Sequence, residues 1–206
     1  MDPVTRLLLI RHGEVAIPYH RVFGGRIDME LSELGHNQAA RLAHYLQAHP
    51  LHRIFVSPMI RAQQTLKPIQ KFHRAEPVTL DGLREVDFGD WTGLNWDQVR
   101  ERFGASAFEW LHQLEAETIP QAERVADFRA RVRRALDEVL AEAQGRTTAV
   151  VCHGGVIRMI LAILLDLPLP KTAHFEIDYA SLSSVEIQPH KCEIRLLNLT
   201  PWRDLP

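Results

Sequence analysis

The chain has little cysteine and no excess of charge of either sign. Its 206 residues include two cysteines, Cys152 and Cys192, and both lie in apolar runs. Two such cysteines make neither a disulfide framework nor a zinc-finger spacing, and we expect both to be small buried side chains. Lysine and arginine total 24 against 26 acidic residues, which leaves a net charge of −2. No positive field therefore favours nucleic acid as a partner.

Long hydrophobic runs are also missing. The longest, residues 7–10 and 159–165, fall far short of the roughly 17 residues that a membrane-spanning helix needs. Because no signal peptide opens the chain either, we expect a cytoplasmic protein that makes no contact with a membrane. With 46% hydrophobic and 24% charged residues, the composition is that of an ordinary globular protein. Its length suits a single domain over residues 1–206.

Short apolar runs alternate with segments of helical periodicity. Residues 5–10, 54–56 and 148–152 predict strands, and their continuous apolar character is typical of strands buried on both faces. Apolar residues recurring every three or four positions predict helices near residues 39–46, 59–72, 125–145 and 156–165. Ser57 and Pro58 are expected to cap the second of these helices. Later strands are expected at residues 175–179, 183–188 and 193–198, the last two as a hairpin.

This alternation predicts an α/β fold with a mostly parallel central sheet flanked by helices on both faces, and an antiparallel tail. Residues 83–94, which contain glycines and acidic residues without helical periodicity, are expected to form a surface loop. Three polar segments, residues 11–13, 57–61 and 153–155, each follow a predicted strand. Because sheets of this kind bind ligands at the carboxyl ends of their strands, we expect these segments to meet at one edge.

The chemistry of these segments points to an anion site. A lone histidine is more often structural. His12 and His153, however, each follow a predicted buried strand and precede a glycine, and the same segments contain Arg11 and Arg61. Guanidinium groups match phosphate oxygens, and two of them with two imidazoles can surround a phosphoryl group. Metal and nucleotide sites are disfavoured because the metalloprotease, Walker and dinucleotide-binding patterns are missing. A Cys152–His153 catalytic pair is also disfavoured, since successive strand residues face opposite sides.

Four ordered segments then resemble the motifs of the histidine phosphatase superfamily, also called phosphoglycerate mutase-like. They are residues 9–14 (LIRHGE), 57–65 (SPMIRAQQT), 83–93 (LREVDFGDWTG) and 151–158 (VCHGGVIR). Residues 23–25 (FGG) and 31–35 (LSELG) also resemble the first loop of the family. The match spans nearly the whole chain, and this order of motifs is highly specific.

The resemblance implies phosphoryl transfer through a covalent phosphohistidine, with no metal and no other cofactor. His12 would be the nucleophile, and Glu85 would protonate the leaving alkoxide and then activate water. The implied phosphoryl ligands are Arg11, Arg61 and His153. The substrate side would be lined by residues 14–18 and by Gly24, Gly25 and Gly154.

The chain also departs from the family pattern. Pro18 stands where members often have asparagine, and residues 121–124 (QAER) stand in place of a Gly-Glu-Ser element, which leaves the role of Glu123 open. Val86 follows Glu85 where mutases have arginine, and Gly155 stands where they have asparagine. The last two departures, with the short interval from Glu85 to His153, favour a phosphatase that acts on a small-molecule phosphate ester.

The substrate is less well defined. Residues 173–187 resemble the tail of α-ribazole phosphatases and of broad-specificity relatives, so α-ribazole 5′-phosphate or a broad substrate range is expected. Four aromatic residues could form a ring-binding pocket or belong to the core: Phe23, Trp91, Trp96 and Phe108. A phosphoglycerate mutase and a non-catalytic phosphate sensor stay open as alternatives, and the sequence does not specify the oligomeric state.

Overall fold

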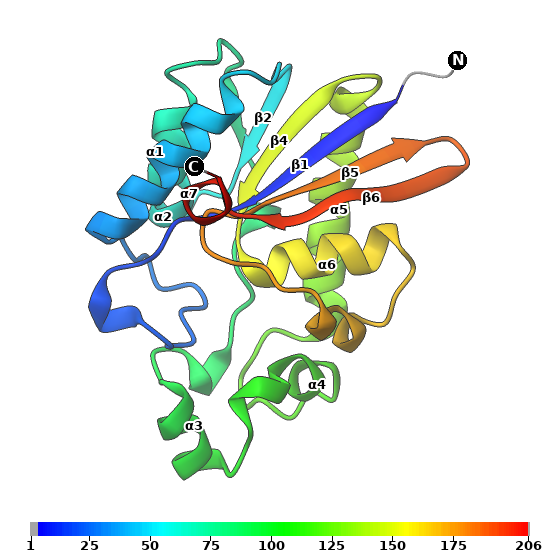
Figure 1. The fold of residues 1–206 in the computed structure, drawn as a ribbon. Helices are drawn as coiled ribbons and strands as arrows, with labels where there is room; N and C mark the ends of the chain where they lie inside the picture. The colour runs from blue at the N-terminus through cyan, green and yellow to red at the C-terminus, as the bar shows by residue number, and fades with distance from the viewer. Residues whose placement is uncertain (1–3, 206) are drawn as a thin grey trace.

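The structure, a computed structural model, describes residues 4–205, which include six strands in one sheet (Figure 1). The order across the sheet is β3-β2-β4-β1-β5-β6. The first four strands in that order pair in parallel, whereas β5 pairs antiparallel with both β1 and β6. The strands are β1 (Thr5–Arg11), β2 (Arg53–Val56), β3 (Pro77–Thr79), β4 (Thr147–Cys152), β5 (Leu182–Gln188) and β6 (Lys191–Leu199).

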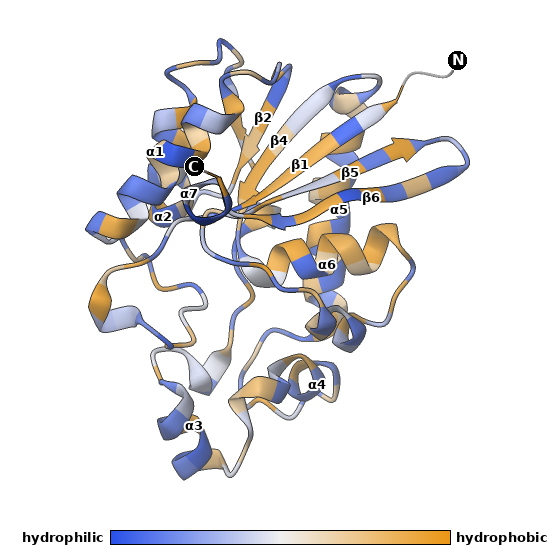
Figure 2. Cartoon of the chain, viewed as in Figure 1, coloured by the Kyte–Doolittle hydropathy of each residue, from blue (hydrophilic) through white to orange (hydrophobic). Residues whose placement is uncertain are grey.

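Helices cover both faces of the sheet, as the sequence predicts. One face carries α1 (Glu33–Leu46) and α2 (Ile60–Ile69), and the other carries α5 (Val125–Ala143) and α6 (Gly154–Leu164). Successive residues of β1 enter different cores: Leu7 and Leu9 pack with α5 and α6, whereas Leu8 and Ile10 pack with α1 and α2. This two-sided burial explains the continuous apolar runs in the central strands, visible in Figure 2. The α/β fold with helices on both faces is confirmed.

Two short helices extend the molecule beyond the carboxyl edge of the sheet. They are α3 (Trp96–Phe103) and α4 (Trp110–Glu115), which lie together in Figure 1. Asn95 and Gln98 form a reciprocal capping box at the start of α3, and Gly104 ends it with a φ of 63°. The short helix α7 (Pro201–Asp204) packs on α1. The sequence reasoning missed these three helices and β3, because each is too short to show a hydrophobic period.

The structure corrects four details. Residues 175–179 are not a strand, because their carbonyl groups bind arginine side chains from other elements. The N-cap of α2 is Met59, without a side-chain cap, so the expected Ser57-Pro58 cap is wrong. The segment of residues 83–94 does not simply cross the surface, since Leu83, Val86 and Trp91 are buried. Cys152 is buried as expected, but Cys192 is partly exposed.

Within residues 4–205, every helix is too short or too polar to cross a membrane. The single domain over residues 1–206 and the cytoplasmic location stay predictions.

Candidate active site

His12 lies directly beyond β1, at the carboxyl edge of the sheet. Its backbone N–H donates to the carbonyl of Cys152 at 3.0 Å, which ties the end of β1 to the end of β4. The ring is buried, and its Nδ1 lies 2.7 Å from the carbonyl oxygen of Gly13. Because a carbonyl can only accept, Nδ1 carries the proton of the neutral ring. The lone pair is therefore on Nε2.

His153 faces His12 from the beginning of α6, and the two ring centroids are 5.2 Å apart. Its Nδ1 accepts a hydrogen bond from Nε of Arg61 at 3.1 Å, so the proton of the neutral ring is on Nε2. That proton is donated to Oγ of Ser57 at 2.8 Å. The hydroxyl of Ser57, expected to cap a helix, thus orients an imidazole instead.

Arg61 lies on α2 with a side chain that is 2% exposed, and it joins the two histidines. Its Nε lies 3.2 Å from Nε2 of His12 and also bonds His153. The two terminal nitrogens donate to the carbonyls of Ile27 at 2.7 Å and Gly25 at 3.0 Å. All three nitrogen atoms of the guanidinium group are therefore fixed, and its orientation is set by backbone groups of the loop after β1.

The charge distribution follows from burial. Desolvation, with the positive charge of Arg61 next in size, holds the pKa values of His12 and His153 well below the usual 6.5. Burial also lowers the pKa of Arg61 to about 10, which keeps the guanidinium group charged at neutral pH. The site therefore combines two neutral imidazoles with fixed positive charge, and the unprotonated Nε2 of His12 accepts a hydrogen bond from Arg61.

Arg11, the last residue of β1, and Arg158 of α6 add two more guanidinium groups. Arg11 donates to the carbonyl of Ile177 at 2.6 Å and stacks over the ring of Tyr179, 4.1 Å from its centroid. Arg158 donates to the carbonyl of Phe175 at 2.8 Å, and burial lowers its pKa to about 10. The Nε of each is buried without a hydrogen-bond partner among the described residues. Buried donors of this kind suit an anionic ligand.

Glu85 reaches the site from the loop after β3. Its Oε1 accepts from the backbone N–H of Val86 at 2.9 Å, and its Oε2 accepts from that of Gly155, in the first turn of α6, at 3.1 Å. Arg131 of α5 holds this loop from behind by donating to the carbonyls of Arg84 at 2.7 Å and Glu85 at 3.1 Å.

Glu123 completes this support. Its carboxylate binds Arg131 through both oxygens, at 2.6 and 2.8 Å, and accepts from the backbone N–H of Asp87. The role that the sequence left open for Glu123 is thus a structural one, because its carboxylate anchors the cation that holds the Glu85 loop.

A cavity of about 310 Å³ brings these groups together at the carboxyl edge of the sheet. Of the residues expected from the sequence, it is lined by Arg11, His12, Gly24, Gly25, Arg61, Glu85 and Gly154. His153 is fully buried and lies behind this surface, against Arg61. Of residues 14–18, Val15 alone lines the cavity; Pro18 lies in a short 3-10 helix (Ile17–Tyr19).

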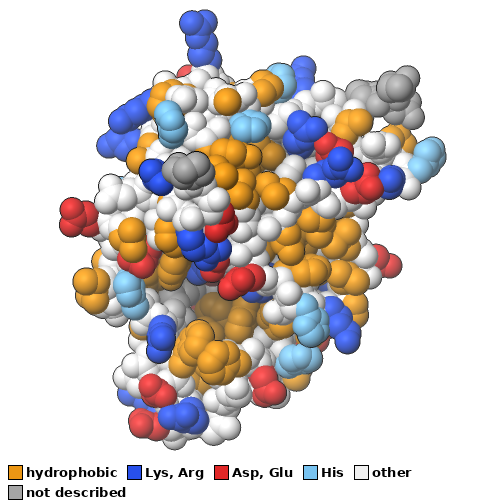
Figure 3. Space-filling view, viewed as in Figure 1, with side chains coloured by type: hydrophobic (Ala, Val, Ile, Leu, Met, Phe, Trp, Pro, Cys, Tyr) orange, Lys and Arg blue, Asp and Glu red, His pale blue; other side chains and the backbone are white. Residues whose placement is uncertain are grey.

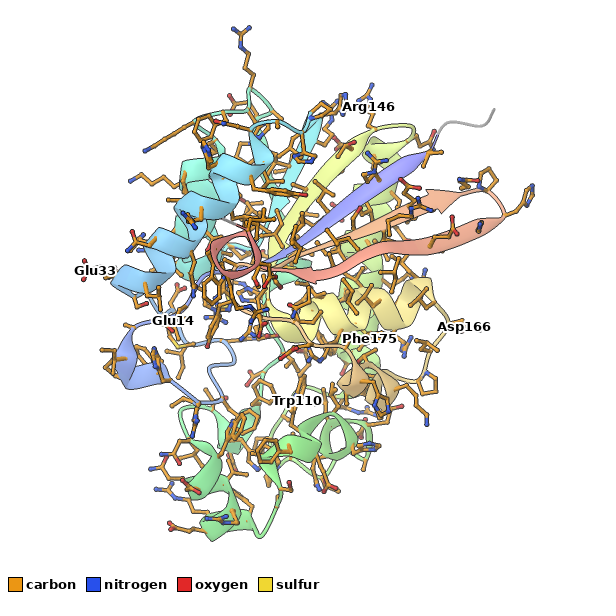
Figure 4. The ribbon with its side chains drawn as sticks, in the orientation of Figure 1. Glu14, Glu33, Trp110, Arg146, Asp166 and Phe175 are labelled. Carbon is orange, nitrogen blue, oxygen red and sulfur yellow. The ribbon has the colours of Figure 1, made fainter. Side chains whose placement is uncertain are left out.

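The sequence reasoning missed other lining residues, chiefly Arg158, Tyr179 and Trp110. Figure 4 shows Trp110 below the carboxyl edge of the sheet and Phe175, whose carbonyl binds Arg158, beside α6. Arg158 lies one helical turn after Gly154, and this spacing could have indicated that both face the site. No comparable spacing in the sequence indicated that Tyr179 lines the cavity.

The four aromatic residues that could have formed one pocket do not form a single cluster, although Phe23 and Trp96 both line the cavity at His12. The ring of Phe23 packs on those of Phe88 and Trp91, and Trp91 is a core residue with 1% exposure. The rings of Trp96 and Phe108 contact each other at the surface, 4.6 Å apart. Cys152 is also a core residue, and burial raises the pKa of its thiol.

The sequence matches the family model of the histidine phosphatase superfamily (branch 1) over residues 7–200. The chain belongs to this superfamily. The match includes each of the side chains that meet around His12 and Arg61. Within residues 4–205, no cluster of three or more histidine, cysteine, aspartate or glutamate side chains has the arrangement of a metal site.

Several known proteins are similar to nearly the whole of this chain. It is 33% identical to the bifunctional protein Rv2228c of Mycobacterium tuberculosis over 96% of this chain and 55% of that protein, so it spans about half the length of this relative. It is 29% identical to phosphoserine phosphatase 1 of Hydrogenobacter thermophilus, over 96% and 93% of the two chains. The structure of the α-ribazole phosphatase from Shigella flexneri is similar with a TM-score of 0.82 and 26% identity, covering 95% of this chain and 96% of that one.

Proposed function

We propose that this chain is a phosphatase that hydrolyses a small phosphomonoester through a phosphohistidine on His12. The observation that carries the proposal is the unprotonated Nε2 of His12, which lies in a cavity whose other polar groups include Arg11, Arg61 and Glu85. Names of relatives that act on phosphate esters support a hydrolase. The domain that would perform this reaction is the whole of residues 1–206.

In the first step, the lone pair on Nε2 of His12 attacks the phosphorus atom, and a P–N bond forms as the P–O bond to the alcohol breaks. The leaving oxygen takes a proton from the carboxyl group of Glu85. Arg11 and Arg61 hold the other phosphoryl oxygens while their charge redistributes, and the free Nε of Arg11 supplies a donor for one of them. The role that the sequence implies for His153 as a phosphoryl ligand becomes a positioning one, because both of its ring nitrogens are already bonded to Arg61 and Ser57. The low pKa of His12 keeps the nucleophile unprotonated.

In the second step, the Glu85 carboxylate takes a proton from water, and the oxygen of that water attacks the phosphorus atom. The P–N bond breaks, its electron pair returns to Nε2 of His12, and phosphate leaves with Glu85 protonated again. Each Glu85 oxygen accepts one backbone hydrogen bond and keeps a second lone pair for the proton. The chain's own groups thus account for every proton transfer.

The substrate is proposed from the relatives and from the tail of the chain. The relatives' names include phosphoserine and α-ribazole phosphatases, so α-ribazole 5′-phosphate or a broad range of small phosphate esters is the best-supported set. Gly24, Gly25 and Gly154 would line the substrate side, where they bring backbone close to the phosphoryl group.

The test is phosphate release from p-nitrophenyl phosphate and a panel of metabolites that includes α-ribazole 5′-phosphate and 3-phosphoglycerate, with EDTA present. We expect release by the wild type and none by His12→Ala. Conversion of 3-phosphoglycerate to 2-phosphoglycerate in place of hydrolysis would show a mutase, and binding of phosphate esters without turnover would show a sensor; either result contradicts the proposal.

A further inference from the structure

A second and larger cavity adjoins the one at His12. Its volume is about 780 Å³, and Arg21, Trp96 and Ala107 line both cavities, which places the two side by side. It lies along α3 and the loop that follows it, on the side of the site away from the sheet. Figure 3 shows the surface hollowed between the sheet and the α3–α4 segment, with hydrophobic side chains at the hollow. This volume far exceeds the need of a phosphoryl group.

Two exposed aromatic rings line the larger cavity. Trp96, the first residue of α3, and Phe108 meet edge to face with ring centroids 4.6 Å apart. Phe108 is 76% exposed and Trp96 is 37% exposed, whereas Phe23 and Trp91 nearby are buried. Burying large aromatic side chains is favourable, and these two are left at the surface of a cavity. The ring surface that this edge-to-face contact leaves uncovered is available to a ligand.

Arg21 lies at the junction of the two cavities. Its backbone has a φ of 56°, an uncommon conformation for a residue with a side chain. The other arginine of the larger cavity, Arg100, is paired with Asp97 at 2.9 Å, whereas Arg21 forms no ion pair with any described residue. A donor between the phosphoryl pocket and the aromatic pair suits an oxygen-rich group that connects a phosphate to a ring.

We propose that the larger cavity binds the alcohol part of the substrate and selects alcohols that carry a planar aromatic or heteroaromatic ring. The inference rests on the proposed function and names its substrate class. With the phosphoryl group at His12, the connecting sugar or alkyl oxygens would pass Arg21, and the ring would stack on Trp96 and Phe108. Ring stacking on aromatic side chains changes affinity by roughly 10-fold or more.

The test compares two phosphate esters that differ by a ring, namely ribose 5-phosphate and adenosine 5′-monophosphate. We expect the wild type to have a kcat/KM about 10-fold higher for the ester with the ring. Phe108→Ala should lower this ratio by about 10-fold, with the loss in KM. Phe72→Ala removes an aromatic ring that is 49% exposed outside both cavities, and it should leave the ratio unchanged. An equal ratio in the wild type and Phe108→Ala would overturn the inference.

A binding measurement separates this inference from the proposed function. Adenosine and ribose lack the phosphoryl group, so their binding can be followed even if the chain hydrolyses nothing. We expect adenosine, unlike ribose, to quench tryptophan fluorescence, and Trp96→Phe to remove most of that quenching. Loss of hydrolysis with this quenching intact would contradict only the proposed function. Hydrolysis of both esters, with no preference of the protein for adenosine over ribose, would contradict only the inference.

Discussion

The backbone N–H of Gly155 donates a hydrogen bond to Oε2 of Glu85 at 3.1 Å, which joins the first turn of α6 to the loop that carries the carboxylate. A Cβ atom at residue 155 would collide with Oε1 of Glu85. Gly155→Ala should therefore displace the proposed general acid and lower kcat on an alkyl phosphate by about 10²- to 10⁴-fold. Steady-state kinetics on glycerol phosphate would measure the effect.

The neighbouring glycine offers a comparison. A Cβ atom at residue 154 would lie 3.5 Å from Nε of Arg11, which is ordinary van der Waals contact. Gly154→Ala should thus lower kcat less than Gly155→Ala. Equal decreases of kcat in the two variants would show that the missing side chain of Gly155 is not what keeps Glu85 in position.

Arg131 and Glu123 form the most buried ion pair near the site, with side chains that are 13% and 10% exposed. Arg131→Met leaves the Glu123 carboxylate with only its longer ion pair to the half-exposed Arg26, at 3.5 Å, and frees three loop carbonyls. We therefore expect it to lower the free energy of unfolding by about 3 kcal/mol, the lower end of the cost of breaking a buried pair. Urea denaturation would measure this change. Because the loop that holds Glu85 also loosens, kcat should fall under conditions in which the variant is folded.

An exposed ion pair of the same segment is the matched control. Arg124 and Glu117 are 70% and 44% exposed, and Glu117→Gln should change the free energy of unfolding by about 1 kcal/mol or less. If Arg131→Met lowers the free energy of unfolding by no more than Glu117→Gln does, Arg131 does not anchor the loop.

Ser57 accepts a hydrogen bond from Nε2 of His153 at 2.8 Å in a fully buried environment. Ser57→Ala leaves that N–H without a partner, which costs about 1–3 kcal/mol, and frees the imidazole to change its tautomer. We expect kcat to fall by about 10-fold and Ser57→Thr to restore most of it. Nitrogen chemical shifts of the His153 ring would report the tautomer; an unchanged tautomer and kcat in Ser57→Ala would contradict this account.

The lowered pKa values of His12 and His153 make stability depend on pH. Both rings stay neutral in the folded protein but bind protons near pH 6.5 in the unfolded chain. The unfolded state therefore binds more protons below pH 6.5, and the free energy of unfolding should fall there by up to about 1.4 kcal/mol per pH unit for each histidine. Urea denaturation at pH 7.5 and 5.5 tests this, and His153→Gln should show a smaller fall than the wild type. The same pH dependence of the free energy of unfolding in the wild type and in His153→Gln would show that His153 does not have a lowered pKa in the folded protein.

Some parts of the fold and site follow from local patterns in the sequence. Central strands buried on both faces leave continuous apolar runs, which is why β1 and β4 could be predicted. Once the strands are parallel, the residues after them must share an edge, and this places Arg11, His12 and His153 together.

Other parts depend on contacts that no local pattern encodes. Residues 175–179 were expected to be a strand from their composition, but Arg11 and Arg158 bind the backbone there, and the position of Tyr179 depends on those bonds. The α3 helix has few apolar residues and depends on its caps; the Asn95–Gln98 spacing was the available signal. The division of the aromatic residues between core and cavity depends on tertiary packing.

The central claim, a covalent phosphohistidine on His12, is tested most directly by trapping it in Glu85→Gln with p-nitrophenyl phosphate. This substrate has a good leaving group, so the first step needs little help from a proton donor, whereas the second step lacks its base. The reaction is stopped in alkaline denaturant and the peptides are analysed by mass spectrometry. The account predicts one phosphoryl group on His12 and none in the His12→Ala/Glu85→Gln double variant. Steady hydrolysis by the wild type, with the phosphoryl group in Glu85→Gln on another residue or on none, would contradict it.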